Sequence, residues 1–518
     1  MNEYADGNSH VNSSTEACVK TRSKTCAAAC AQTHINSSTT DSTVAAEHAP
    51  KPSVAQRSIL GLQHMFAMFG ATILVPILVN GYFHGEGLSV QTTLLAAGVG
   101  TLLFHLITKG KVPAFLGSSF AFLGGFATIA TLDQGPYKDL TYGEKLPYAC
   151  GGIVVAGLLY LVLAALIKLV GAKKVMRFLP PVVTGPMIIC IGLSLAPSAI
   201  ANCETNWPLA LIAAGIVVVA NIWGKGMIKI IPILLGVIGA YAVALAMQAI
   251  GLTNADGSAI IDTTAIATSS WVGLPPIIIA KFDLSAILVM APIAIATMME
   301  HIGDISAISA TTHQNFIESP GLHRTLTGDG LATALAGFFG GPANTTYGEN
   351  TGVLALSGVY DPSVIRLAAI YAIVLGFIPK LSSLLATMPT AIVGGISLVL
   401  YGMISAIGVR NLVENRVDLT VPRNLIVAAA IMVVGLGMTA GLTFTVAGTP
   451  VTLTPLALAA LVGIILNAIF PGKDYDFGAR PAGDIHRGVS FNNDVKPATS
   501  PQDGTTPADT SNPYTSIR

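Results

Sequence analysis

The chain has 518 residues, of which 52% are hydrophobic and only 10% are charged, and its 27 basic and 27 acidic residues give a formal net charge of zero. A soluble domain carries about 25% charged residues, so this chain has too little charge to cover a water-facing globule. The balance also argues against a nucleic-acid partner, which needs a concentrated basic face. The composition therefore predicts a membrane-embedded bundle of roughly a dozen helices.

Both ends of the chain are polar. Residues 1–55 are rich in Ser, Thr, Asn and Ala, and residues 474–518 include the stretch PATSPQDGTTPADTSNP. The first segment has no apolar core of the kind that a signal peptide needs, and we expect two disordered cytoplasmic tails. Cys26, Cys30 and His34 are spaced by four and could share one helix face as metal ligands; the favoured interpretation is a reduced tail without a metal.

Between the tails, apolar segments recur, several of them interrupted by Gly and Pro, and they predict an all-α polytopic membrane protein with about 14 transmembrane segments. The expected spans are 59–79, 90–108, 113–132, 148–170, 178–197, 207–223, 228–250, 284–305, 325–340, 343–358, 364–386, 388–408, 422–442 and 451–470.

The distribution of Lys and Arg predicts the orientation. These residues gather in and beside alternate loops, whereas the intervening loops hold few of them: Lys138, Lys145, Lys281 and Lys380. Loops rich in Lys and Arg stay on the cytoplasmic side. An even number of spans then puts both termini in the cytoplasm, as expected for a multi-pass protein of the plasma membrane.

The third and tenth spans are interrupted in the same way. The third begins KVPAFLGSSFAF at residue 111, and the tenth begins GPANTTYGEN at residue 341. Each places Pro, Gly and hydroxyl residues ahead of a resumed apolar helix, which predicts an extended stretch followed by a half-helix. A matching pair of interrupted segments in two halves of seven spans is typical of an inverted-repeat transporter with its substrate at their junction. Two merely kinked or re-entrant helices are the alternative.

Several side chains in these segments are candidates for chemistry, because polar groups at membrane depth are costly. Glu349 is expected near the positive end of a half-helix. Glu300 and Asp304 are spaced by four on one helix face, and two carboxylates in an apolar bundle resist being ionised together, so one is expected to hold a proton. A structural pair bonded to hydroxyls is the alternative. His301 points about 100° away and is a weaker candidate for substrate contact.

Aromatic and histidine side chains complete the candidates. Phe120 and Tyr347 offer ring faces beside the two interruptions, which would suit a flat ligand. His64 lies near the start of the first span, where a packing role and a proton relay both remain open.

At these residues the chain resembles the nucleobase–ascorbate transporters, also called the nucleobase–cation symporter-2 family, and especially their bacterial uracil permeases. The matching stretches lie between about residues 56 and 471: QHMFAMFGATILVP at 63–76, GKVPAFLGSSFAF at 110–122, EHIGD at 300–304, GLHRTLTGDGLAT at 321–333, NTTYGENTGVLAL at 344–356 and GGISLVLYGMISAIGVR at 394–410.

The resemblance implies a seven-plus-seven inverted repeat with a core domain, formed by spans 1–4 and 8–11, and a gate domain, formed by spans 5–7 and 12–14. Short antiparallel strands are expected in spans 3 and 10. The resemblance implies that residues 56–197 hold the first core segments and the start of the gate, and that residues 198–283 hold gate spans 6 and 7 with an extracellular loop. Residues 284–387 would hold the second core segments, and residues 388–473 would hold the remaining gate segments.

The resemblance also implies roles for individual residues. Glu300 and Glu349 would hydrogen-bond a nucleobase, to which Phe120 and Gly348 would contribute backbone groups. Ala71 and Tyr347 would line the pocket. His64 and Asp304 would belong to the proton-coupling network together with Glu349, and Tyr401 would lie nearby on the gate side.

Substrate and coupling ion follow from the same resemblance. The expected function is import of uracil with a proton as the coupling ion and without a cofactor, by a homodimer in the lipid bilayer. A xanthine or other purine carrier is the nearest alternative. Glu349 favours uracil, whereas Ser357-Gly358, where close uracil permeases carry a second-position arginine, departs from the pattern. Asp304 occupies a position that is histidine in some uracil permeases.

Two further protein classes and a second coupling ion are alternatives. An anion exchanger of the sulfate-permease type would need a neutral or positive site, which Glu300 and Glu349 disfavour. An intramembrane enzyme would use Glu300, His301 and Asp304 as a metal or acid–base cluster, but no His-Glu-x-x-His motif is present. Sodium coupling stays open, although no oxygen-rich cation cage is visible in the sequence.

Overall fold

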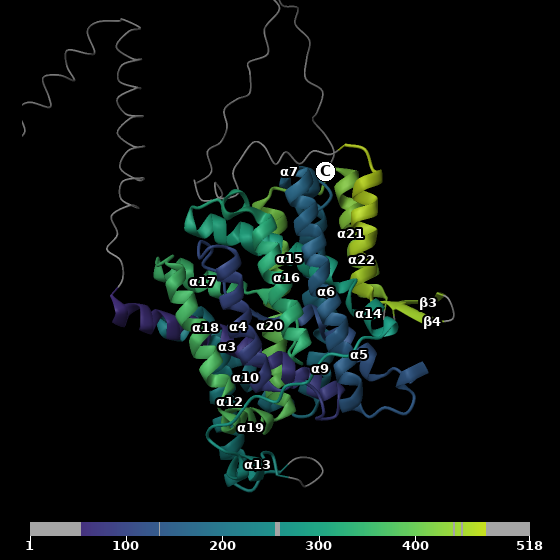
Figure 1. Ribbon diagram of the computed structural model, residues 1–518. Coiled ribbons are helices and arrows are strands. Elements are labelled where there is room, and N and C mark those ends of the chain that lie inside the picture. Colours follow the sequence, from purple (N-terminus) through teal and green to yellow (C-terminus); the bar gives the residue numbers. More distant parts are fainter. Residues whose placement is uncertain (1–52, 134, 254–258, 439–440, 447–448, 473–518) are drawn as a thin grey trace, which may run out of the picture. The chain divides into compact units, whose positions relative to one another are not determined.

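The computed structural model describes residues 53–133, 135–253, 259–438, 441–446 and 449–472, so that residues 1–52 and 473–518, including Cys26, Cys30 and His34, lie outside the described residues. The N-terminal tail expected to reach residue 55 ends earlier, because α3 begins at Val54. Helices dominate this part of the chain (Figure 1). In chain order the elements are α3 (Val54–Tyr82), α4 (Val90–Ile107), β1 (Leu116–Ser118), η1 (Phe120–Phe122), α5 (Leu123–Ala130), η2 (Gly135–Tyr137), α6 (Tyr142–Val170), α7 (Ala172–Met176), α8 (Pro181–Ser194), α9 (Ala196–Glu204), α10 (Trp207–Ile222), α11 (Met227–Ile230), α12 (Pro232–Ala249), α13 (Thr264–Thr268), α14 (Leu284–Met290), α15 (Ile293–Thr312), η3 (Ile317–Gly321), α16 (Leu322–Phe338), β2 (Asn344–Thr346), α17 (Gly348–Ser357), α18 (Pro362–Gly376), α19 (Pro379–Ala386), α20 (Thr390–Glu414), α21 (Pro422–Gly437), β3 (Leu442–Val446), β4 (Thr449–Leu453) and α22 (Pro455–Ile469).

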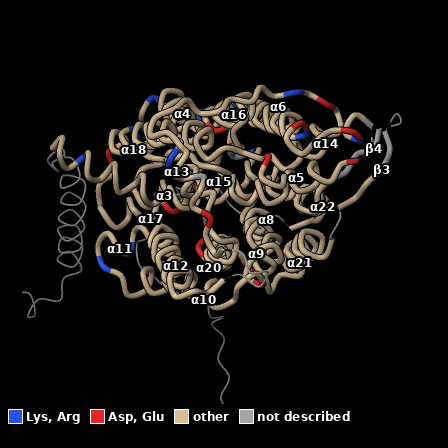
Figure 2. The backbone as a smooth tube through the Cα atoms, turned by 90° about the horizontal axis from the view of Figure 1, so that it is seen from below, with Lys and Arg blue, Asp and Glu red and all other residues tan. Residues whose placement is uncertain are grey.

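Many of these helices are long and apolar enough to cross a membrane. Among the described residues, seven helical stretches meet this condition, with α8–α9 and α14–α15 each counted as one, and an eighth does so if the bent pair α18 and α19 counts as one. Four shorter apolar helices accompany them, at 120–130, 207–222, 422–437 and 455–469. Figure 2 shows long stretches of chain without Lys, Arg, Asp or Glu. The expected multi-pass helical membrane architecture is confirmed at this level.

Local sequence explains where several helices begin. Proline occupies the first or second position of α10, α12, α18, α21 and α22, where its missing N–H costs no intrahelical hydrogen bond. At the start of α6, the Thr141 side chain accepts a bond from the Glu144 backbone N–H, and the Glu144 side chain accepts one from the Thr141 backbone N–H. Such reciprocal caps fix the first turn of a helix.

Three expected spans differ from the structure in where their helices end or bend. The span expected at 364–386 is two helices, α18 and α19, that meet at 79° just before Pro379. The ends of the spans expected at 422–442 and 451–470 are wrong, because residues 442–446 and 449–453 form the antiparallel strands β3 and β4. Helix α21 accordingly ends at Gly437, and α22 begins only at Pro455.

Helices from distant parts of the chain pack in two groups. In the first, α16 packs along α6 and α4, and α4 packs along α18. In the second, α20 packs against α8, α9 and α10, while α21 packs against α8 and α22. Helix α15 touches both groups, since it contacts α6 and α16 as well as α8 and α22.

The contact between α6 and α16 depends on small residues. A Cβ atom added at Gly157 would lie 2.5 Å from the Gly330 carbonyl oxygen, and one added at Gly330 would lie 2.4 Å from Tyr160 Cβ. Because lipid tails are as apolar as leucine, helices in a membrane associate through close backbone packing of this kind. This contact fixes the part of α16 that faces the candidate site.

Candidate functional site

Strands β1 and β2 pair with each other, although more than two hundred residues separate them in the sequence. Leu116 lies opposite Thr346, and Ser118 lies opposite Asn344. Two more backbone bonds extend the ladder, from Ser119 N–H to the Ala343 carbonyl (2.8 Å) and from Tyr347 N–H to the Phe115 carbonyl (3.0 Å). The pairing satisfies backbone groups that would be costly to leave unbonded in a membrane. Both predicted extended stretches are therefore present, each ahead of a short helix.

Helix α4 and helix α16 hold this strand pair. The Leu116 backbone N–H donates to Thr101 Oγ1 (2.9 Å), and the Thr101 hydroxyl donates to the Leu116 carbonyl (3.2 Å). On the other strand, Thr333 of α16 donates its hydroxyl to the Asn344 carbonyl (3.0 Å). The Asn344 side-chain amide donates in turn to the carbonyls of Ala96 and Ala332, at 3.3 Å each.

Tyr347 links both strands to α3. A Cβ atom at Gly117 would lie 2.4 Å from the Tyr347 ring, so only glycine permits this packing. The Tyr347 hydroxyl donates to the Ser118 carbonyl (2.9 Å), and the Thr72 hydroxyl lies 3.3 Å from Tyr347 Oη. Ala71, the neighbour of Thr72, is fully buried. Tyr347 and Ala71 thus lie beside the strand pair, and their contact with a substrate stays a prediction.

The candidate carboxyl groups gather beside the strands. Glu300 and Asp304 lie on α15, and Glu349 is the second residue of α17, which has no side-chain cap at its N-terminus. Glu300 Oε2 is buried and has no hydrogen-bond partner within the part of the chain that the structure describes. A Cβ atom at Gly348 would lie 3.8 Å from Asp304 Oδ1. Four carboxyl groups are close enough to interact electrostatically: Glu300, Asp304, Asp329 and Glu349.

His64 lies next to the same helix. Its Nδ1 atom accepts from the Asn350 side-chain amide (3.2 Å), which also donates to the His64 carbonyl (3.1 Å). This arrangement leaves the ring proton on Nε2, which is buried and has no partner among the described residues. The structure therefore brings His64 into contact with Asn350, which follows Glu349 in the sequence. The role of His64 as a proton relay stays a prediction.

An aromatic contact joins the strand region to the second packing group. The rings of Phe120 and Tyr401 lie edge to face, with centroids 5.9 Å apart and an interplanar angle of 76°. The Tyr401 hydroxyl is buried without a hydrogen-bond partner among the described residues. Tyr401 lies on α20, which belongs to the second packing group. This contact therefore connects the second packing group to the strand region at the candidate site.

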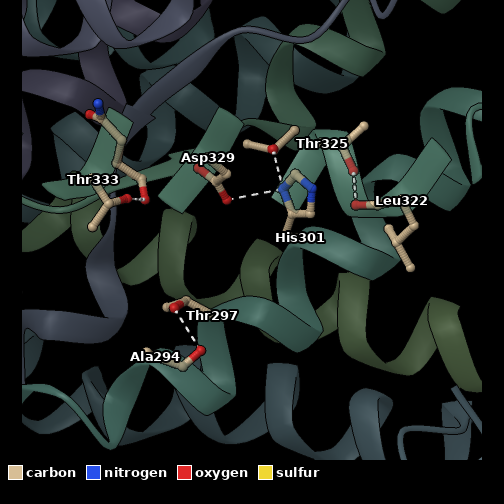
Figure 3. Close-up of polar contacts among 9 residues, drawn as sticks. Ala294, Thr297, His301, Leu322, Thr325, Asp329 and Thr333 are labelled. Carbon is tan, nitrogen blue, oxygen red and sulfur yellow. Dashed lines mark hydrogen bonds and ion pairs between the residues drawn. The ribbon is translucent and has the colours of Figure 1, made fainter. Parts of the chain in front are cut away.

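One charged residue of the site escaped the sequence analysis. Asp329 of α16 is fully buried, and its Oδ2 atom lies 3.0 Å from Nδ1 of His301 (Figure 3). The same nitrogen lies 2.9 Å from Thr346 Oγ1. His301 therefore contacts Asp329 and strand β2. The signal that could have identified Asp329 is a lone acidic residue in the apolar stretch of the ninth span.

No group of three or more His, Cys, Asp or Glu in the described ranges is arranged to hold a metal ion. Glu300, His301 and Asp304 all lie on α15.

Known proteins place the chain in a family. A family model described as the permease family matches residues 55–444. The uracil permease of Bacillus caldolyticus is 39% identical over 438 residues, which cover 82% of this chain and 94% of that protein. The uracil permease of Bacillus subtilis (strain 168) is also 39% identical, over 429 residues that cover 79% of this chain and 91% of that protein.

A solved structure supports the fold alone. The transmembrane domain of the cyanobacterial bicarbonate transporter BicA aligns with a TM-score of 0.53 and 16% identity, covering 80% of this chain and 96% of that domain. The matching family model and the long alignments to uracil permeases establish that the chain belongs to the permease family of nucleobase–ascorbate transporters, which are multi-pass membrane transporters.

Proposed function

We propose that this transporter imports uracil together with a proton by alternating access. The observation that carries the proposal is the placement of two carboxyl groups, Glu300 on α15 and Glu349 at the uncapped N-terminus of α17, beside the β1–β2 pair. The names of the relatives, which are uracil permeases, supply the substrate class.

Uracil suits such a site because its edge alternates N–H donors and carbonyl acceptors. A carboxylate can accept from a ring N–H, and a protonated carboxyl or a free backbone N–H can donate to a ring carbonyl. Glu300 and Glu349 would read this edge, and the backbone at Phe120 and Gly348 would supply the remaining bonds. Ala71 and Tyr347 would cover the ring faces. The first N–H groups of α17 have no side-chain cap, which leaves them available as donors.

Proton coupling follows from the crowding of the acidic groups. Neighbouring carboxylates in a low-dielectric site resist being ionised together, so one of them binds a proton when the site forms. We assign this coupling to Asp304 and Glu349, with His64 as a relay and Tyr401 on the gate side. Proton binding thus becomes part of assembling the uracil site, without any cofactor.

The architecture that supports this cycle is the 14-span, seven-plus-seven inverted repeat. The two packing groups of helices favour a core formed by spans 1–4 and 8–11 and a gate formed by spans 5–7 and 12–14. Residues 56–197 then hold the first core segments and the start of the gate, because α8 packs against α20 and α21. The core would carry the carboxyl cluster past the gate, and the Phe120–Tyr401 contact would change during the movement. The charge of the loops favours cytoplasmic termini, and we propose a homodimer through the gate.

The xanthine alternative depends on Ser357-Gly358. Ser357 is the last residue of α17, eight residues beyond Glu349, which corresponds to about 12 Å along a helix. Its hydroxyl lies 3.3 Å from the Val359 backbone N–H, which donates to it, and 3.4 Å from the Leu354 carbonyl. This departure lies at the far end of α17 from Glu349, so it does not by itself change the proposed substrate site.

Uptake of labelled uracil by a bacterial strain without its own uracil carriers tests the substrate. We expect expression of the protein to confer uptake that excess unlabelled uracil suppresses and excess xanthine leaves unchanged. The matched control is the same strain carrying an empty vector. Suppression by xanthine to the same extent as by uracil would instead assign the site to a broader or purine specificity.

A further inference from the structure

His301 occupies an unusual position between two elements of the site. The residue is fully buried on α15, directly after Glu300, and its Nδ1 atom contacts both Asp329 Oδ2 (3.0 Å) and Thr346 Oγ1 (2.9 Å). Thr346 is the last residue of β2, three residues before Glu349. One ring nitrogen thus joins the helix that carries Glu300 to the strand that leads to Glu349.

Asp329 is held rigidly where it meets this ring. It lies between two glycines of α16 that pack against different helices: a Cβ atom at Gly328 would lie 2.8 Å from the ring of Phe104, and one at Gly330 would lie 2.4 Å from Tyr160 Cβ. The sequence Gly-Asp-Gly therefore allows α16 to approach α4 and α6 closely on both sides of the acid. The Asp329 carboxyl has little freedom to move away from His301.

Helix α16 secures β2 at two points. Thr333, one turn after Asp329, bonds the Asn344 carbonyl at the start of the strand. At the end of the strand, Thr346 contacts His301, whose ring faces Asp329 in Figure 3. Residues four apart share a helix face, so both anchors come from one side of α16. Fixing both ends of a three-residue strand leaves it little freedom relative to α15.

The chemistry of the contact favours a permanent connection. A proton on His301 Nδ1 can be shared between the Asp329 carboxylate and the Thr346 oxygen, because both oxygens are acceptors and lie 3.0 Å and 2.9 Å from that nitrogen. Leaving a fully buried carboxylate without this partner would be costly. This cost keeps the His301 ring in contact with Asp329. The Thr346 hydroxyl stays in contact with the same ring nitrogen.

We propose that Asp329 and His301 are positioning residues of the substrate site. Asp329 orients the His301 ring, and the ring holds Thr346, so that Glu349 keeps a fixed distance from Glu300. This inference rests on the proposed function, since both glutamates must bind one substrate for their separation to matter.

Uracil exchange kinetics of purified variants in proteoliposomes test the proposal. Asp329→Ala, His301→Ala and Thr346→Val should each raise the apparent KM for uracil about tenfold, as expected when one bond that orders the site is lost, and change the maximal rate much less. The double variant Asp329→Ala/His301→Ala should raise KM no further than the larger single effect, because both residues act through one contact. Thr346→Ser keeps the hydroxyl and should retain the KM of the unmodified protein.

Thr325→Val is the matched control. Thr325 is a fully buried threonine of the same helix α16, and its hydroxyl donates to the Leu322 carbonyl of its own turn (3.0 Å; Figure 3). This variant should leave KM unchanged. If either alanine variant does not yield folded protein, the comparison of Thr346→Val with Thr346→Ser still decides the matter.

Two results would overturn the inference, and they are distinguishable. Equal KM values for Thr346→Val, Thr346→Ser and Thr325→Val, in protein that exchanges uracil normally, would remove the positioning role alone. An unmodified protein that exchanges no uracil would contradict the proposed function, and this inference with it.

Discussion

Replacing Glu349 with alanine should abolish uracil uptake, with a loss of at least about a hundredfold, while the protein remains folded in the membrane. The side chain lies at the uncapped start of α17 and next to the carboxyl groups of α15. A hydrogen bond to a charged group contributes about 1.5–3 kcal/mol, and the loss of two such bonds accounts for a hundredfold or more. Initial rates of uptake, normalised to the amount of protein in the membrane, measure the effect.

A second glutamate provides the control for this variant. Glu414 lies at the end of α20, where it pairs with Arg410 in a partly exposed position. Glu414→Ala removes the same group outside the candidate site and should transport at the normal rate. Normal uptake by Glu349→Ala would eliminate the proposed substrate site.

Replacing Asp304 with asparagine should separate coupling from exchange. Asp304 shares one face of α15 with Glu300 and lies near the Gly348 backbone, but it is not assigned a bond to the substrate. An asparagine keeps the shape and cannot bind or release a proton. We therefore expect a large loss of the stimulation by an inward proton gradient, about tenfold, with exchange of internal for external uracil reduced much less.

The measurement compares gradient-driven uptake with exchange in the same vesicles. Asp418→Asn is the matched control, because Asp418 accepts bonds from the backbone and side chain of Thr420 in an exposed loop and should affect neither rate. Retention of the full response to the gradient by Asp304→Asn would exclude Asp304 from proton coupling.

The strand pair could be predicted from the sequence because its signals are local. Pro113 and Pro342 precede runs of small and hydroxyl residues in segments that are otherwise apolar, and a proline favours a break in a helix because it removes a backbone hydrogen bond. The register of β1 against β2 could not be predicted, since it depends on anchors such as Thr101 and Thr333 on other helices.

The hairpin β3–β4 was missed although its pattern was visible. Leu442, Phe444 and Val446 alternate with Thr443 and Thr445, and this period of two is typical of a strand. The overall hydrophobicity of this segment concealed its period of two, because the same residues also continue the apolar segment that precedes them.

Asp329 was missed for a different reason. Glu300 and Asp304 attract attention as a pair within one helical turn, whereas Asp329 meets His301 only through the packing of α16 against its neighbours. The spacing of Asp329 and His301 along the sequence does not predict that contact. A single acid within an apolar helix was the available signal, and its partner became identifiable only in three dimensions.

Uptake of radiolabelled uracil into proteoliposomes with an imposed pH gradient tests the central claim most directly. Vesicles that are more alkaline inside should accumulate uracil above its external concentration, a protonophore should abolish the accumulation, and excess unlabelled xanthine should leave it unchanged. Uracil–proton symport would be contradicted by accumulation that does not depend on the proton gradient and requires sodium. It would also be contradicted by vesicles that accumulate xanthine and no uracil.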